Sequence, residues 1–191
     1  MNIGLFFGSF NPIHVGHLII AQGALNETNL DRIWFVVSPQ NPLKDKKTLL
    51  SEYDRLRMVE LGIGDNIDIM ASNVEFGLPK PSYTIDTLRF LRKEQPEYTF
   101  SLIMGEDNLD TLHKWKDYEE LLRDYQIYCH PRIGRGETNR NAYPQVKFFN
   151  LNLLDISATR IREMLKSGKS VRYLVTEEVH DYIQKNNLYA V

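Results

Sequence analysis

Short, largely apolar runs that alternate with helical segments constrain the fold of this chain most. The runs occupy residues 2–7, 32–38, 99–105, 124–130 and 145–151. Strands that are apolar on both faces must be covered on both faces, as in a parallel sheet packed between helices. We therefore predict an α/β fold with a mostly parallel sheet and helices on both of its faces.

The segments between and after these runs have the apolar spacing of helices. They comprise residues 16–28, 51–63, 84–94, the stretch around Leu121, 158–166 and 176–189. The last two form a short C-terminal helical segment, in which Ser157 and Thr176 are suited to N-cap the helices and Gly168 to end the first. The length of 191 residues, without repeats, predicts one domain over residues 1–191.

Charge and cysteine content narrow the function classes. Lys and Arg number 23 and Asp and Glu 25, so a net charge of −2 favours neither nucleic acid nor a membrane as partner. Cys129 is the only cysteine, which excludes an internal disulfide and fits a reducing cytoplasm. No run approaches the roughly 18 apolar residues that span a bilayer. We expect a cytoplasmic protein, and its oligomeric state stays open, a homo-oligomer included.

The stretch GSFNPIHVGHL (residues 8–18) places His14 and His17 three residues apart, just behind the first predicted strand. One interpretation is a metal site, but zinc requires a third protein ligand and the segment offers none at a recognisable spacing. A second is a packed turn with two hydrogen-bonded histidines. We favour a third, phosphate binding, because a helix N-terminus attracts anions through its N–H groups and dipole. Gly8 would let the backbone approach a phosphate, and Ser9 would add a hydroxyl.

Two further segments are candidate binding loops. Residues 38–48 and 131–144 are polar, contain basic side chains, and each follows a predicted strand. Loops after parallel strands open at the carboxyl edge of the sheet, where open α/β folds bind ligands. Either loop is equally well explained as a solvated connection.

Two signatures together indicate a family. GSFNPIHVGHL resembles the HxGH signature of the nucleotidyltransferase superfamily, and ISATRIR (156–162) resembles its second signature. With KPSYTIDTLRFL (80–91), MGEDNLDTLHKWKDYEELL (104–122) and VRYLVTEEVHDYIQKNNLY (171–189), the chain resembles bacterial nicotinate-nucleotide adenylyltransferase over nearly its whole length. The resemblance implies a Rossmann-like nucleotidyltransferase fold. It also implies transfer of AMP from ATP, with Mg²⁺, to nicotinate mononucleotide, giving deamido-NAD and pyrophosphate.

The resemblance also implies residue roles, with His14 and His17 as the catalytic pair that contacts the ATP phosphates. Asp107 would lie near the adenosine ribose, and the start of the helix at residue 158 would hold the β- and γ-phosphates. The implied ATP-binding residues are Gly8, Ser9, Phe10, His14, His17, Asp107, Ser157, Thr159 and Arg162. No metal held by protein side chains is implied, because Mg²⁺ would arrive with ATP.

Nicotinate mononucleotide would occupy a second group of residues. The N–H groups near Tyr83 and Thr84, at the start of a predicted helix, would receive the nicotinate carboxylate. Trp115 would stack on the pyridine ring. Lys44 would lie near the mononucleotide phosphate, and Arg132 on the mononucleotide side.

The sequence departs from the family pattern at Phe7, where a second glycine is common, at Ser9, where threonine is common, and at Asn11 and Leu43. Asn11 stands where aspartate is common, which removes a charge, and Leu43 stands where histidine is common. Three rival functions stay open. One rival is phosphopantetheine adenylyltransferase, which generally has threonine in place of His14. The others are a nicotinamide-mononucleotide adenylyltransferase and a non-catalytic nucleotide-binding domain.

Overall fold

Six parallel strands form the centre of the fold in a computed structural model that describes residues 1–39, 49–131, 142–151 and 154–189. Their order across the sheet is β3-β2-β1-β4-β5-β6. The strands are β1 (Asn2–Gly8), β2 (Arg32–Val37), β3 (Ile69–Ser72), β4 (Thr99–Gly105), β5 (Gln126–His130) and β6 (Lys147–Phe148). The predicted parallel sheet is thereby confirmed. β3 was not predicted, and the run at 145–151 contributes only two strand residues.

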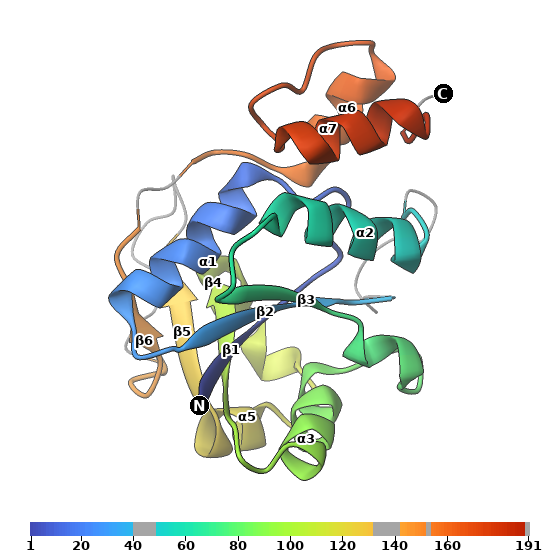
Figure 1. The fold of residues 1–191 in the computed structure, drawn as a ribbon. Coiled ribbons are helices and arrows are strands. Elements are labelled where there is room, and N and C mark those ends of the chain that lie inside the picture. Colours follow the sequence, from blue (N-terminus) through green and yellow to red (C-terminus); the bar gives the residue numbers. More distant parts are fainter. Residues whose placement is uncertain (40–48, 132–141, 152–153, 190–191) are drawn as a thin grey trace.

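Helices cover both faces of the sheet (Figure 1). α1 (Val15–Glu27) and α2 (Glu52–Ile63) lie on one face, and α3 (Thr84–Glu94) and α5 (Tyr118–Asp124) lie on the other. The chain ends in α6 (Ala158–Lys166) and α7 (Glu177–Lys185), which lie together beyond α2. The short elements are α4 (Glu106–Leu109) and the 3₁₀ helices η2 (Val74–Gly77) and η3 (Leu112–Lys114).

The predicted caps of the C-terminal helices are confirmed. The Ser157 hydroxyl accepts a hydrogen bond from the Arg160 N–H at 3.3 Å, and the Thr176 hydroxyl accepts one from the Val179 N–H at 3.4 Å. Gly168 follows the end of α6 with a φ of 67°, a left-handed conformation that favours glycine.

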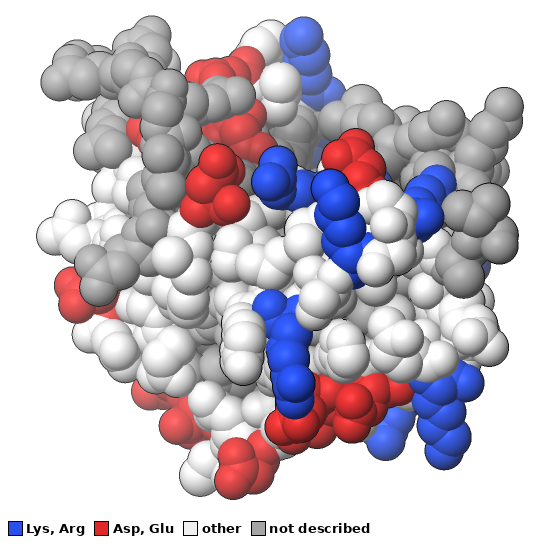
Figure 2. Space-filling view, turned by 90° about the horizontal axis from the view of Figure 1, so that it is seen from above, with Lys and Arg blue, Asp and Glu red and all other residues white. Residues whose placement is uncertain are grey.

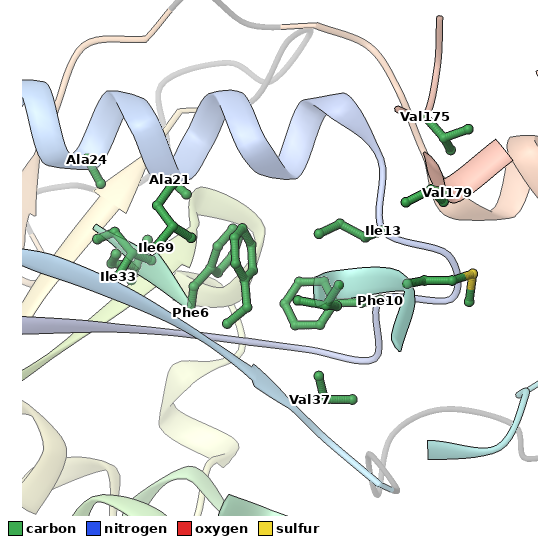
Figure 3. Close-up of a cluster of buried hydrophobic side chains, with 14 of the residues drawn as sticks. Phe6, Phe10, Ile13, Ala21, Ala24, Ile33, Val37, Ile69, Val175 and Val179 are labelled. Carbon is green, nitrogen blue, oxygen red and sulfur yellow. The ribbon is translucent and has the colours of Figure 1, made fainter. Parts of the chain in front are cut away.

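Alternating residues of the central strands contribute their side chains to two apolar clusters. Ile3 and Leu5 of β1 pack with the α3 side, whereas Phe6 packs with the α1 and α2 side. The cluster that contains Phe6 continues past the end of β1 to Val175 and Val179 of the C-terminal segment (Figure 3). The C-terminal helices therefore share a core with the end of the first strand. None of the described helices is long and apolar enough to cross a membrane.

The strand order creates a topological switch at β1. The chain runs from β1 to β2 and β3 on one side and returns through β4 to β5 and β6 on the other. β1 pairs with both β2 and β4. In such sheets the carboxyl ends of the two strands at the switch diverge and leave room for a ligand. The loop that carries His14 begins here.

Candidate functional site

The loop between β1 and α1 folds back on the end of its own strand. Phe10 has a φ of 43°, and its side chain is only 2% exposed. Its ring packs edge-on against Phe6 (Figure 3), and also against Phe35 and His17. A Cβ atom at Gly8 would lie 2.7 Å from that ring, which explains glycine at this position by packing. The buried side chain of Phe10 therefore anchors the loop in the core.

His14 and His17 form one unit at the start of α1. His14 is the N-cap residue and is 7% exposed, and its ring stacks on that of His17 with 3.7 Å between centroids. The His14 backbone N–H donates to His17 Nδ1 at 3.2 Å. Because Nδ1 accepts this bond, a neutral His17 ring carries its proton on Nε2, which is then a donor.

The backbone amides at the start of α1 are only partly available to an anion. The Val15 N–H donates to the Leu174 carbonyl at 3.0 Å, and the His17 N–H donates to the His14 carbonyl at 2.9 Å. In the described part of the chain the Gly16 N–H has no backbone acceptor. A Cβ at Gly16 would lie 3.0 Å from His14 Nδ1. Glycine here leaves room for the His14 ring, and the residue itself is buried, so a ligand would have to reach its amide from within the loop.

The start of α6 meets the start of α1. The Cβ position of Gly16 lies 3.8 Å from Cβ of Ile156, directly before the N-cap residue Ser157. Arg162 Nη1 donates to the Asn11 carbonyl at 2.8 Å, and its Nη2 donates to Thr159 Oγ1 at 3.2 Å. The structure thus brings the second signature beside the first, as expected of two segments that share one ligand.

Asp107 lies at the carboxyl end of β4, in the first turn of α4. A Cβ at Gly105 would lie 2.5 Å from Asp107 Oδ1 and 3.1 Å from His130 Nε2. His130 ends β5, is 2% exposed, and its Nδ1 lies 3.0 Å from the Pro131 carbonyl. His130 was not predicted as a site residue, although it is the last residue of a predicted strand, a position that could have indicated it.

The predicted pyridine-binding residues also lie together. Tyr83 is the N-cap residue of α3, and Lys116 Nζ lies 5.1 Å from the centre of its ring. Lys116 also pairs with Asp86 of α3 at 2.7 Å. The adjacent Trp115 is half-buried, and within the described residues its indole N–H has no hydrogen-bond partner. Trp115 packs against the apolar cluster that contains Ile85 and Leu88 of α3, and its neighbour Lys116 contacts Tyr83 and Asp86.

A buried carboxylate that the sequence analysis missed supports this N-terminus. Glu75 of η2 is 1% exposed and accepts hydrogen bonds from Ser82 Oγ and Thr87 Oγ1, both at 2.8 Å. These bonds tie the residues before and inside α3 to the segment that follows β3. Because β3 was not predicted, nothing in the sequence marked Glu75 as adjacent to a sheet.

A buried arginine, also missed, holds the loops after β1 and β2. Arg55 of α2 is fully buried, and burial lowers the pKa of its guanidinium. It donates to the carbonyls of Leu50, Ser9, Ser38 and Pro39 at 2.6–3.2 Å. An arginine inside an amphipathic helix is indistinguishable in sequence from a solvated one, so this role needed the structure.

The two halves of the candidate site meet at the start of α2. Lys80, shortly before α3, pairs with Glu52 in the first turn of α2 at 2.8 Å. Arg55, one turn further on, binds the Ser9 carbonyl. The predicted substrate contacts Lys44 and Arg132 lie outside the described residues, as do most of the two basic loops.

Local groups dominate the electrostatics of the site. On the face that carries the C-terminal helices, Figure 2 shows acidic and basic side chains interspersed among uncharged ones. Among the described residues no three His, Cys, Asp or Glu side chains are grouped so as to hold a metal ion. An anion at this site would be bound by imidazole, amide and guanidinium donors.

Comparisons with known proteins agree with this geometry. The model of the cytidylyltransferase-like family matches residues 5–164. The chain is 48% identical over 190 residues to a probable nicotinate-nucleotide adenylyltransferase of Cytophaga hutchinsonii, covering 100% of this chain and 99% of the relative. A protein of the same description from Flavobacterium johnsoniae is 48% identical over 191 residues, covering 99% of each chain.

Solved structures share the fold. The nicotinic acid mononucleotide adenylyltransferase of Plasmodium falciparum complexed with NaAD superposes with a TM-score of 0.79, covering 98% of this chain and 97% of that one. Its sequence is 22% identical, so this likeness concerns the fold. Full-length identity to the bacterial relatives carries the assignment further: the chain belongs to the cytidylyltransferase-like family and, within it, to the nicotinate-nucleotide adenylyltransferases.

Proposed function

We propose that this protein transfers the adenylyl group of ATP to nicotinate mononucleotide, releasing pyrophosphate and forming deamido-NAD. The observation that carries the proposal is the stacked pair His14–His17 at the start of α1, against the start of α6 and at the switch point of the sheet. Relatives named for this activity align with the chain along its whole length.

The chemistry requires positioning and charge stabilisation. A 5′-phosphate oxygen of the mononucleotide attacks the α-phosphorus of ATP, and the bond from that phosphorus to the bridging oxygen of the β-phosphate breaks. The nucleophile is already an anion at neutral pH, so no protein base is needed. Negative charge grows on the departing pyrophosphate. His17 Nε2–H and the Gly16 amide are suited to donate to these oxygens.

The second signature would assist at the far end of the triphosphate. Thr159 is exposed in the first turn of α6, and the Ser157 hydroxyl caps that helix. The Arg162 guanidinium bridges Thr159 and the Asn11 carbonyl, and it retains further N–H donors for a phosphate. We propose that the β- and γ-phosphates bind between the starts of α1 and α6.

Preference for nicotinate over nicotinamide would arise at the N-terminus of α3. A carboxylate is stabilised by the unpaired amides and dipole of a helix start. Thr84 begins this helix, and Trp115, which precedes Lys116 in the chain, would supply an aromatic face for the pyridine ring. A neutral carboxamide gains less from this site, so the acid is the expected substrate.

Mg²⁺ would enter as part of the MgATP substrate, since Mg²⁺ at nucleotide sites is bound largely by phosphate oxygens and water. Asp107, beside the end of β4, is the carboxylate we propose at the adenosine end. We further propose a cytoplasmic location, with neither nucleic acid nor a membrane as partner. A homo-oligomer is compatible with the proposal.

Pyrophosphate release with MgATP and three acceptors tests this function. We expect rapid release with nicotinate mononucleotide, release at least tenfold slower with nicotinamide mononucleotide, and none with phosphopantetheine. Equal rates with both mononucleotides would contradict recognition of the carboxylate. No release with any acceptor would contradict the function.

A substitution at Thr84 sharpens this test. Thr84→Val keeps the shape of the side chain but removes its hydroxyl, so it should raise KM for nicotinate mononucleotide several-fold and leave KM for MgATP unchanged. Thr111→Val is the matched control, because among the described residues the Thr111 hydroxyl donates within its own turn, to the Asn108 carbonyl.

A further inference from the structure

The loop that carries the histidines is held by a residue near the far end of the chain. Asn11 is 4% exposed, and its Oδ1 accepts a hydrogen bond from the Tyr189 hydroxyl at 2.8 Å. The Leu50 N–H donates to the same oxygen at 3.4 Å. The side chain of Asn11 thus fixes the middle of the loop, in the turn at Asn11 and Pro12 and three residues before His14.

The C-terminal segment contacts this loop at several points. Arg162 donates to the Asn11 carbonyl, and the Leu174 carbonyl accepts from the Val15 N–H at the start of α1. Ile13 belongs to the same buried cluster as Val175 and Val179 of the C-terminal segment (Figure 3). The loop is therefore packed between its own sheet and the C-terminal helices.

We propose that Tyr189 is a positioning residue for the proposed ATP site, acting through Asn11 to fix the loop that presents His14 and His17. The inference rests on the proposed function only where it names ATP. The phenol is suited to this task because Tyr189 is 8% exposed and its hydroxyl has a buried acceptor. Burial also raises the pKa of the Tyr189 phenol, so it stays a donor throughout the neutral range.

The inference explains why asparagine at position 11 is compatible with the site. The Asn11 side chain is turned into the protein, toward Tyr189 and the Leu50 amide, and both interactions use only its oxygen. An amide oxygen can accept both of these bonds, as a carboxylate oxygen can. The absence of a carboxylate at this position therefore leaves the anchoring of the loop intact.

Tyr189→Phe tests the proposal, with Tyr182→Phe as a matched control. The Tyr182 hydroxyl donates to Asp54 Oδ1 at 2.9 Å, so it also joins the C-terminal segment to the body of the protein, but it does not contact the loop. Each variant removes one phenol hydrogen bond and no ring; the Tyr189 phenol is buried and the Tyr182 phenol is partly buried. A purely structural role for Tyr189 predicts similar behaviour of the two variants.

We expect Tyr189→Phe to lower kcat/KM for MgATP about tenfold, as for the loss of one buried hydrogen bond, while KM for nicotinate mononucleotide changes less than twofold. Hydrogen exchange of the amides of residues 9–17, measured without ligand, should accelerate in Tyr189→Phe and stay as in the parent in Tyr182→Phe.

Each outcome has a distinct meaning. If the two variants match in exchange and in kinetics, the positioning role is wrong. If neither the parent nor a variant transfers an adenylyl group, the proposed function fails, whereas faster loop exchange confined to Tyr189→Phe would still support the anchoring role.

Discussion

The rings of His14 and His17 stack with 3.7 Å between centroids and 23° between planes, while the His14 backbone N–H is bound to His17 Nδ1. The bond fixes the rotation of the His17 ring and leaves Nε2 as its donor. The stack in turn limits the movement of His14. The two imidazoles therefore act as one preorganised pair.

His17→Ala removes a donor to the leaving pyrophosphate. Because a preorganised donor to developing charge contributes strongly to the rate, we expect a roughly 10²–10³-fold loss of kcat with little change in Tm. Steady-state kinetics and thermal unfolding measure the two effects. His180→Ala, on α7, is the control and should retain full activity. An unfolded His17→Ala protein, or one with full activity, would favour a packed turn over a phosphate site.

Gly16→Ala should separate activity from stability. A Cβ at position 16 would lie 3.0 Å from His14 Nδ1, so the His14 ring must shift by a few tenths of an ångström. We expect about a tenfold loss of kcat, since small misplacements of catalytic groups are costly. Tm should stay constant or rise, because alanine favours helix over glycine. Gly77→Ala, whose Cβ would meet nothing within 4 Å, is the control.

Arg55→Lys should destabilise the fold, because lysine cannot reproduce the planar fork that binds the carbonyls of Ser9, Ser38 and Pro39. Leaving buried acceptors unpaired should cost about 3 kcal/mol in the free energy of unfolding. Arg57→Lys, an exposed neighbour paired with Glu60, should cost less than about 0.5 kcal/mol. Urea unfolding measures both, and equal losses would contradict the role of Arg55.

The apolar pattern of the sequence predicted the helices and strands that are long or apolar. The helix over residues 84–94 and the strand over residues 99–105 match α3 and β4 residue for residue. β3 was not predicted because it has four residues, of which only Ile69 is buried. Its sequence therefore has neither a long apolar run nor an alternation of apolar and polar residues. Short edge strands depend on their neighbour for stability, and that neighbour is distant in sequence.

Residues of the candidate site could be predicted from the sequence only where they belong to a recognisable motif. The two signatures gave His14 and the start of α6, and the structure brings them together. Tyr189 and Glu75 were not predicted from the sequence. Their hydrogen-bond partners lie 178 and up to 12 residues away, and a polar residue in a helix or turn is normally interpreted as solvent-exposed. Supporting residues of this kind are recognised by burial, which single-sequence patterns do not reveal.

Alkaline unfolding tests the burial of Tyr189. Burial raises its pKa in the folded protein, so the bound proton contributes stability below the pKa of an unfolded tyrosine, and that contribution is lost as the pH rises. Above about pH 10 the stability advantage of the parent over Tyr189→Phe should shrink by about 1.4 kcal/mol per pH unit. Urea unfolding of both proteins from pH 8 to pH 11 measures this difference. A constant difference would show that the phenol titrates normally.

A crystal structure with a nonhydrolysable ATP analogue tests the central claim most directly. We predict the triphosphate between the starts of α1 and α6, with His17 Nε2 and the Gly16 amide within hydrogen-bond distance of its oxygens. A nucleotide bound elsewhere on the protein, with the two imidazoles making no contact to phosphate, would contradict the claim.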